Sequence, residues 1–235
     1  IRRYSMIDCI IRGEGEIALR DTVRHLLQGN RPAQKIIDGI RVDELDTLPP
    51  AYSFTGPMSG VDVNEQFKYI ITSRGCPHHC TYCCSPAFWG RRTTFRSAIA
   101  MADMVEHLYR EYGIIYFSIR DDNFTLKRER VLDFCREIRA RGIFPMWNCQ
   151  SRVDTIDLEM IVEMKKSGME HIQFGVESGS PAILKQYDKS IDTGAVVRAT
   201  LAARRAGVYL SVYLMNGMHG EHAEDVNRTI ALIRK

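Results

Sequence analysis

Short apolar runs alternate with amphipathic stretches from about Lys68 to the end of the chain. This alternation constrains the fold most, because repeated strand and helix units build a parallel sheet covered by helices. Apolar residues spaced three and four positions apart predict the helices. Segments rich in β-branched and aromatic residues predict five strands, at 68–72, 114–119, 146–149, 171–176 and 209–214. The sequence therefore predicts an α/β protein with five β/α units.

The sequence before these units predicts a separate, smaller element of structure. Residues 6–11 favour a strand and residues 17–27 a helix, which are too few elements for a core of their own. Residues 43–50 are polar and end in two prolines, so they are typical of a linker. The helix pattern of residues 224–235 stops without a cap or a following strand, and we therefore expect a fragment of a longer protein.

Composition excludes several classes of protein. The 235 residues are 45% hydrophobic and 26% charged, which is enough to bury a core. The net charge of +3 and the short patch of Arg91, Arg92 and Arg96 do not indicate nucleic-acid binding, because charge runs are usually solvated. No apolar run approaches the roughly 18 residues of a membrane span, and no signal segment is recognisable. We expect a cytoplasmic protein without a membrane or nucleic-acid partner.

Four of the seven cysteines lie within nine residues. Cys76, Cys80 and Cys83 have a C-x3-C-x2-C spacing directly after the first predicted strand. Seven is an odd number, and a tight cluster of thiols in a reducing compartment indicates a metal or iron-sulfur site rather than disulfides. Three thiolates can hold three irons of a cubane cluster and leave the fourth iron open. The adjacent Cys84 is off the spacing, and we interpret it as a small buried apolar side chain.

A zinc site is the alternative for the same cysteines. His78 or His79 would then supply the fourth ligand of a closed tetrahedral site, and the chain would be a zinc-binding module without catalysis. No second pair of ligands at comparable spacing supports this alternative.

The segment from Thr72 to Cys83 resembles the signature of radical S-adenosylmethionine (SAM) enzymes. Residues 121–124, 175–179 and 216–221 resemble the strand-end motifs of this family in the same order. The resemblance implies a partial (β/α) barrel, with five of six units in residues 67–235, and a 4Fe-4S cluster bound by Cys76, Cys80 and Cys83. It also implies reductive cleavage of SAM to a 5'-deoxyadenosyl radical, a small-molecule substrate, and an electron donor such as ferredoxin or flavodoxin.

Residues 8–16 and the linker resemble the end of a cobalamin-binding domain found in one subgroup of this family. This resemblance implies that residues 1–42 are the remnant of such a domain, that residues 43–66 are the linker, and that the protein uses cobalamin to methylate or rearrange an unactivated carbon. A cobalamin-independent methylthiotransferase is the alternative within the family.

The resemblance also implies which residues contact SAM. Tyr82 matches an aromatic position near the adenine, and Asp121 or Asp122 would accept hydrogen bonds from the amino group. The sequence has Asp-Asp-Asn where many members have Gly-Gly-Glu, so the choice of carboxylate stays open. Arg152 suits the SAM carboxylate. A helix cap for the aspartates and a surface ion pair for Arg152 are the alternatives.

Two further strand ends complete the predicted SAM site. Glu177 and Ser178 would bind the ribose hydroxyls, unless they cap the helix that begins near Pro181. Asn216 and Gly217 would let the backbone approach the adenine, unless they form an ordinary turn. The sequence assigns no catalytic residue.

Overall fold

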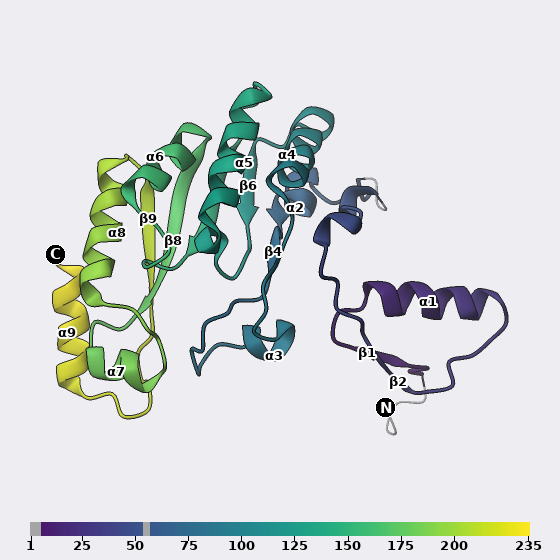
Figure 1. Cartoon of the computed structure of the whole chain (residues 1–235), viewed down its shortest axis with the longest axis horizontal. Helices are drawn as coiled ribbons and strands as arrows, with labels where there is room; N and C mark the ends of the chain where they lie inside the picture. Colours follow the sequence, from purple (N-terminus) through teal and green to yellow (C-terminus); the bar gives the residue numbers. More distant parts are fainter. Residues whose placement is uncertain (1–5, 54–56) are drawn as a thin grey trace.

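Five parallel strands form the central sheet of the computed structural model, in the order β3-β6-β7-β8-β9 (Figure 1). The structure describes residues 6–53 and 57–235, so residues 1–5 of the predicted remnant (1–42) and residues 54–56 of the predicted linker (43–66) lie outside the described residues. Strands that are neighbours in this sheet are joined by helical crossovers, which confirms the α/β partial barrel. The five predicted strands correspond to β3 (Tyr69–Ile70), β6 (Tyr116–Ile119), β7 (Met146–Ser151), β8 (Met169–Glu177) and β9 (Tyr209–Leu214).

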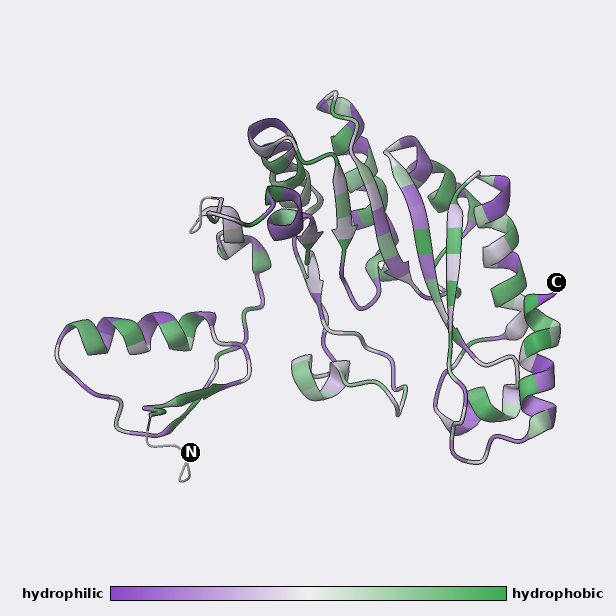
Figure 2. Ribbon diagram, turned by 180° about the vertical axis from the view of Figure 1, so that it is seen from behind, coloured by the Kyte–Doolittle hydropathy of each residue, from purple (hydrophilic) through white to green (hydrophobic). Residues whose placement is uncertain are grey.

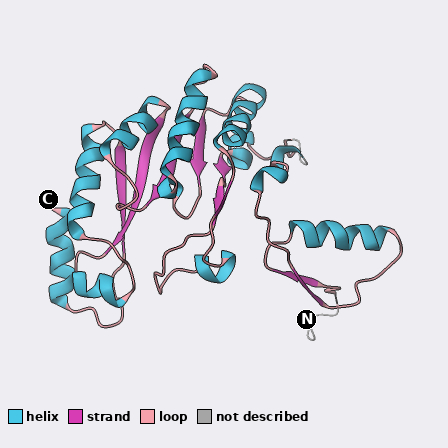
Figure 3. Cartoon of the chain, in the orientation of Figure 1, coloured by secondary structure: helices cyan, strands magenta, loops and turns pink. Residues whose placement is uncertain are grey.

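Helices cover one face of this sheet (Figures 1 and 3). Their apolar sides pack on the strands in one continuous core, in which Trp147 lies edge-on to Phe124 and Phe134 with ring centroids 5.6 and 5.7 Å away. No helix among the described residues is long and apolar enough to cross a membrane. The helices of the barrel are α4 (Ala98–Tyr112), the 3-10 turn Phe124–Leu126, α5 (Arg128–Ala140), α6 (Leu158–Lys166), α7 (Pro181–Gln186), α8 (Thr193–Arg205) and α9 (Ala223–Ile233).

The register of the strands separates an apolar face from a polar face. The side chains under the helices are Ile70, Ile119, Cys149, Ile172 and Leu210, which are paired in register across the five strands. The residues one position earlier or later point to the opposite face, because side chains alternate along a strand. Figure 2 shows this opposite face turned away from the helices.

The first part of the chain forms a small unit beside the barrel (Figure 1). The predicted helix is present as α1 (Glu16–Leu27). The strand predicted at 6–11 is the shorter β1 (Ile10–Arg12), because residues 6–9 do not pair, and β1 pairs in parallel with β2 (Ile36–Asp38), which the sequence did not predict. Three residues are too few to show a strand pattern, so β2 could not be recognised. Two 3-10 turns (Leu45–Thr47 and Ala51–Ser53) and α2 (Val63–Phe67) lead to the barrel.

Ion pairs join this small unit to the segment that carries the cysteines. Arg74 contacts both Glu14, at 2.8 Å, and Glu16. Arg41 donates a hydrogen bond of 2.6 Å to the carbonyl of Trp89. The partners on the barrel side lie in β4 (Ser73–Arg74) and α3 (Ser85–Trp89), which flank the cysteine loop, and β4 pairs antiparallel with β5 (Thr94–Phe95).

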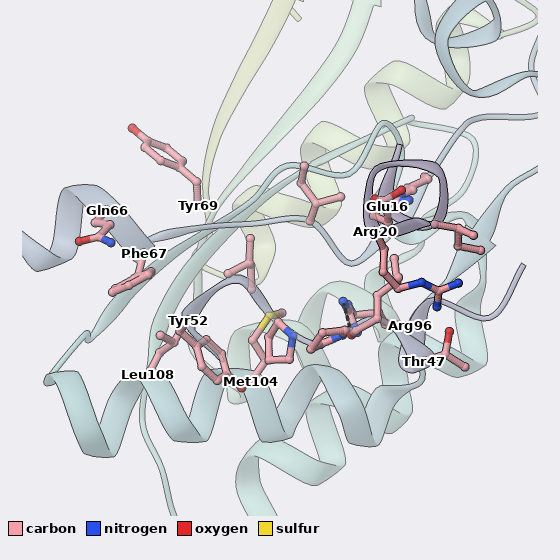
Figure 4. A pocket seen from close by; sticks show the side chains of 17 residues that line it. Glu16, Arg20, Thr47, Tyr52, Gln66, Phe67, Tyr69, Arg96, Met104 and Leu108 are labelled. Atoms are coloured by element: carbon pink, nitrogen blue, oxygen red, sulfur yellow. Dashed lines mark hydrogen bonds and ion pairs between the residues drawn. The ribbon is translucent and has the colours of Figure 1, made fainter. Parts of the chain in front are cut away.

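A hollow of about 630 Å³ lies between α1, the linker and α4 (Figure 4). Apolar side chains such as Tyr52, Phe67 and Leu108 line it, with Arg96 at one end. None of the residues predicted to bind the cluster or SAM lines this hollow.

Candidate functional site

The cysteine loop begins at a glycine that no other residue could replace without strain. Gly75 has φ +86°, and a Cβ there would lie 2.4 Å from the carbonyl oxygen of Arg92. The loop then turns back, because the amide of Cys83 donates to the carbonyl of Cys80 at 3.1 Å. All seven cysteines of the chain are free thiols. Cys80 is buried, Cys76 is half-buried and Cys83 is exposed.

One pocket of about 170 Å³ brings the three predicted ligands together with several predicted SAM contacts. The carboxyl ends of neighbouring parallel strands meet at the same edge of the sheet, and this edge faces the cysteine loop. The residues that line the pocket are Cys76, His78, Cys80, Tyr82, Cys83, Asp122, Gln150, Ser151, Arg152, Gln173, Gly175, Glu177, Lys189 and Tyr213.

Arg152 carries positive charge into this pocket. Its Nη1 lies 3.8 Å from the sulfur of Cys80, and Asp154 accepts hydrogen bonds of 2.9 and 2.7 Å from its Nε and Nη2. Burial opposes the charge, but the contact with Asp154 outweighs burial and raises the pKa of Arg152. Burial also raises the pKa of the Cys76 thiol. Arg152 is therefore a buried cation next to the cysteines. Its ion pair with Asp154 is not the surface ion pair that the sequence left as the alternative.

Tyr82 contributes a neutral phenol to the same pocket. Burial, together with the negative charge of Glu177, raises the pKa of Tyr82 far above its usual value. Its ring lies 6.3 Å from that of Tyr187. The side chain is therefore an uncharged aromatic surface beside the cysteines at any physiological pH.

Glu177 ends β8 in an unusual backbone conformation. Its φ is +67°, which few residues other than glycine adopt, and such strain concentrates at functional sites. Its carboxylate pairs with Nζ of Lys189 at 3.2 Å. Gly175 leaves room for this pair, because a Cβ there would lie 2.8 Å from Oε1 of Glu177.

Lys189 was missed by the sequence analysis. It lies between α7 and α8, and its side chain is only 6% exposed although it carries a charge. A single lysine between two helices gives no sequence signal that distinguishes it from a surface lysine.

The two candidate aspartates have different surroundings. Asp121 is fully buried, and its two oxygens accept four hydrogen bonds of 2.6 to 2.9 Å from the amides and hydroxyls of Thr72 and Ser73. It also lies 3.6 Å from Arg130. Asp122 is exposed, lines the pocket, and accepts a hydrogen bond of 2.8 Å from Ser85. The structure therefore brings Asp122 to the cysteines and uses Asp121 to hold the strand before them.

Three other predicted SAM contacts are not among the residues that line the pocket. Ser178 is fully buried, where its hydroxyl accepts from the amide of Ser180 and contacts Thr229. Asn216 and Gly217 are exposed, and the amide of Gly217 donates to Glu221 at 2.7 Å. Ser178 is engaged by α9 and residues 216–221 form a local turn, and a strand-end pattern in the sequence distinguishes neither from ligand contact.

Cys84 is exposed, so the prediction of a buried apolar side chain was wrong. It precedes the short helix α3, whose buried position is taken by Ser85. Among the described residues, no group of three or more His, Cys, Asp or Glu is arranged to hold a single metal ion.

The family model of the radical SAM superfamily matches residues 70–233. The chain belongs to the radical SAM superfamily. The match covers the barrel and the cysteine loop, and membership implies a 4Fe-4S cluster and SAM as cofactors. Three free thiols that share one pocket with a buried guanidinium fit such a cluster, since thiolates are its usual ligands.

Relatives of this radical SAM chain include methyltransferases and cyclases. An uncharacterized methyltransferase of Pyrococcus horikoshii is 30% identical over 257 residues, which cover 100% of this chain and 54% of the relative. The anaerobic magnesium-protoporphyrin IX monomethyl ester cyclase of Rubrivivax gelatinosus is 26% identical over 100% of this chain and 46% of its own. The chain spans about half the length of these curated relatives.

Two solved structures share the fold of this radical SAM chain. The methyltransferase TsrM from Kitasatospora setae, with cobalamin and a 4Fe-4S cluster bound, has a TM-score of 0.77 at 19% identity over 95% of this chain and 48% of its own. The cobalamin-dependent enzyme OxsB, with aqua-cobalamin and SAM bound, has a TM-score of 0.72 at 18% identity over 95% of this chain and 35% of its own. At these identities the likeness concerns the fold alone.

Proposed function

We propose that this chain is the cluster-binding and SAM-binding part of a cobalamin-dependent radical SAM enzyme that methylates or rearranges an unactivated carbon of a small molecule. The observation that carries the proposal is the shared pocket of Cys76, Cys80 and Cys83 with Asp122, Arg152 and Glu177. When bound, the cluster and SAM supply a 5'-deoxyadenosyl radical that abstracts a substrate hydrogen.

The residues of the pocket have separate tasks in this proposal. Cys76, Cys80 and Cys83 are the cluster ligands, and Cys84 is not a ligand. Asp122 accepts hydrogen bonds from the amino group of SAM, because its second oxygen is free of the contact with Ser85. Arg152 pairs with the SAM carboxylate, since a guanidinium binds carboxylates in a fixed geometry.

The far side of the pocket holds the nucleoside in this proposal. Glu177 accepts hydrogen bonds from the ribose hydroxyls, and the contact with Nζ of Lys189 holds its carboxylate in place. The neutral ring of Tyr82 lies against the adenine. Water is excluded mainly on the side of the buried residues Cys80, Arg152 and Lys189.

Cobalamin and the division of the chain into residues 1–42, 43–66 and 67–235 are part of the same proposal. The parallel β1 and β2 with α1 between them support an α/β remnant in the first region. The contacts of Arg74 with Glu14 and Glu16 support a docking of this region beside the cysteine loop. TsrM and OxsB, which share the fold, bind cobalamin.

We further propose a ferredoxin or flavodoxin as electron donor and the cytoplasm as location. An iron-sulfur cluster with an open iron needs a reducing compartment and a supply of single electrons. The seven free thiols agree with such a compartment.

The test is anaerobic incubation of the reconstituted protein with SAM and dithionite, followed by mass spectrometry of the products. Wild-type protein should release 5'-deoxyadenosine and methionine, whereas Cys80→Ala should release neither. Cys84→Ser is the matched control and should keep the wild-type yield. Absence of 5'-deoxyadenosine from a protein that carries an intact cluster would contradict the proposal.

A further inference from the structure

A basic segment of the surface follows the cysteine loop. From Arg74 to Ala102 the sequence has four arginines and no aspartate or glutamate, although 29 of the 235 residues of the chain are acidic. Two of these arginines, Arg91 and Arg92, lie directly after α3 and are exposed. In Figure 1, α3 stands apart from the helices that cover the sheet. The segment therefore combines positive charge with a position beside the predicted cluster ligands.

This segment packs against the start of the cysteine loop. A Cβ at Gly75 would lie 2.4 Å from the carbonyl oxygen of Arg92 and 3.2 Å from Cβ of Trp89. Both residues thus lie against the position directly before Cys76. At the other end of the loop, Cys83 is the exposed member of the three predicted ligands, and α3 begins two residues after it. The basic segment is therefore an outer surface of the loop that carries the ligands.

The positive charge of this surface is only partly neutralised. Arg41, from the small unit, donates hydrogen bonds of 2.6 and 2.8 Å to the carbonyls of Trp89 and Arg92, which holds a third guanidinium here. Asp43 pairs with Arg92 at 3.1 Å and with Arg41 at 3.4 Å. Within the part of the chain that the structure describes, Arg91 makes no ion pair. Three arginines thus face one aspartate, and the surface keeps a net positive charge.

An exposed aromatic side chain lies next to these charges. Phe88 is 73% exposed, and its ring lies edge-on to that of Trp89 at 5.5 Å. The guanidinium of Arg74 lies 5.2 Å from the ring centroid of Trp89 and holds this ring in place. A single exposed apolar side chain is ordinary, but an aromatic ring among arginines has the composition that protein interfaces favour. Phe88, Arg91 and Arg92 therefore have the composition of a small docking surface.

We propose that Phe88, Arg91 and Arg92 form the docking surface for a small acidic protein that carries one electron. Positive charge selects a negatively charged partner and steers it to this side of the molecule. An electron carrier is favoured over other acidic proteins because the exposed Cys83 and the contact with Gly75 place this surface beside the cluster ligands. Complexes of electron carriers bury little area, which suits a surface of three side chains.

The electron transfer itself changes no bond. The docked carrier is oxidised by one electron, and the cluster bound in the cysteine loop is reduced by the same electron. The inference rests on the proposed function, because it needs a cluster at Cys76, Cys80 and Cys83.

The test uses the reconstituted protein with a reduced flavodoxin as the carrier, and stopped-flow absorbance follows oxidation of the flavodoxin. The double variant Arg91→Glu with Arg92→Glu should lower the second-order rate at low salt about tenfold or more, because steering contributes at least this factor between opposite charges. Salt at about 0.5 M should bring the wild-type rate close to that of this variant, because it screens the charges. Phe88→Ser should lower the rate about fivefold at either salt concentration, because it removes an apolar contact.

Controls separate docking from damage to the site. Arg204→Glu with Arg205→Glu makes the same change of charge at two adjacent exposed arginines of α8, which do not line the cysteine pocket, and should leave the rate unchanged. Arg91→Lys with Arg92→Lys keeps the charge and should keep the wild-type rate within about twofold. Dithionite needs no docking surface, so the yield of 5'-deoxyadenosine with excess dithionite should be the same in all variants.

A second measurement does not depend on the cluster. Carbodiimide joins lysines to carboxylates that they touch, so cross-linking of the Arg91→Lys, Arg92→Lys variant to oxidised flavodoxin should connect position 91 or 92 to a flavodoxin carboxylate, as mass spectrometry would show. Equal rates for wild type and Arg91→Glu with Arg92→Glu would overturn the inference. Binding of wild type to phosphatidylglycerol vesicles that this variant loses would overturn it as well, since the surface would then serve a membrane. Absence of 5'-deoxyadenosine with dithionite would instead contradict the proposed function.

Discussion

The guanidinium of Arg152 lies 3.8 Å from the sulfur of Cys80 and is held there by the two hydrogen bonds that it donates to the carboxylate of Asp154. A cation that is fixed beside a thiolate ligand stabilises added negative charge, so it favours reduction of a bound cluster. The same cation is the group that we assign to the SAM carboxylate. Arg152 therefore links the electron-accepting and the SAM-binding parts of the site.

Arg152→Gln should lower the midpoint potential of the bound cluster by about 40 mV, the equivalent of roughly 1 kcal/mol for one electron. Anaerobic redox titration followed by electron paramagnetic resonance measures this potential. Arg139→Gln, which removes a partner of Glu163 on the outside of the barrel, is the control and should leave the potential unchanged. A potential in Arg152→Gln equal to that of wild type would show that the cation does not act on the cluster.

Asp121→Asn should lower the free energy of unfolding by about 3 kcal/mol. The change replaces a buried acceptor of four hydrogen bonds, and it removes the charge next to Arg130. Urea unfolding of the protein followed by circular dichroism measures the loss. A stability within about 0.5 kcal/mol of wild type would contradict the structural role of Asp121.

Asp122→Asn should weaken the binding of SAM and leave the stability of the protein unchanged. The side chain is exposed, so the free energy of unfolding should change by less than about 0.5 kcal/mol. The dissociation constant of SAM should rise about tenfold, because a charge-assisted hydrogen bond is replaced by a neutral one. Equilibrium dialysis with labelled SAM measures this constant. Unchanged binding would show that a residue other than Asp122 binds the amino group of SAM.

Lys189 and Glu177 should be coupled in a double-mutant cycle. Lys189→Met alone leaves a poorly hydrated carboxylate without its partner and should cost about 3 kcal/mol of stability. The double variant Lys189→Met with Glu177→Gln should cost less than the sum of the two single changes, by at least about 1 kcal/mol. Urea unfolding of all four proteins gives the coupling energy, and strictly additive costs would show that the pair does not interact.

His171 should make the protein less stable at acid pH. Burial lowers its folded pKa, so the unfolded chain, with a histidine pKa of about 6.5, binds the proton more readily. The contribution of His171 is therefore present above about pH 6.5 and is lost as the pH falls toward 5. His171→Gln should show a smaller drop in urea midpoint between pH 7.5 and 5.5 than wild type does. The exposed His25→Gln should keep the full drop.

The barrel could be predicted from the sequence because its signal is repeated. Each of the five strands carries apolar residues between amphipathic helices, and the C-x3-C-x2-C loop follows the first strand. For the residues at the carboxyl ends of the strands, the sequence predicted their position in the fold but not the direction in which each side chain points. Asp121 and Asp122 are adjacent, and only the three-dimensional contacts with Thr72 and Ser73 distinguish the buried carboxylate from the exposed one.

Other parts of the site depend on contacts between distant segments. Lys189 acquires its role by packing against Glu177 from a loop twelve residues later. Ser178 is drawn into a contact with Thr229, which lies in α9. Cys84 is exposed because the turn before α3 buries Ser85 in its place. Local sequence patterns do not predict these contacts, because the partners come from segments that are distant in the sequence.

The most direct test of the account is the metal content and spectrum of anaerobically reconstituted protein. The account predicts about four irons and four sulfides per chain, broad absorption near 400 nm, and a change in the electron paramagnetic resonance signal of the reduced cluster when SAM is added. Cys76→Ala, Cys80→Ala and Cys83→Ala should each lose the intact cluster and the response to SAM, and Cys84→Ser should retain both. One zinc per chain in a colourless protein, or a full cluster in Cys80→Ala, would contradict the account.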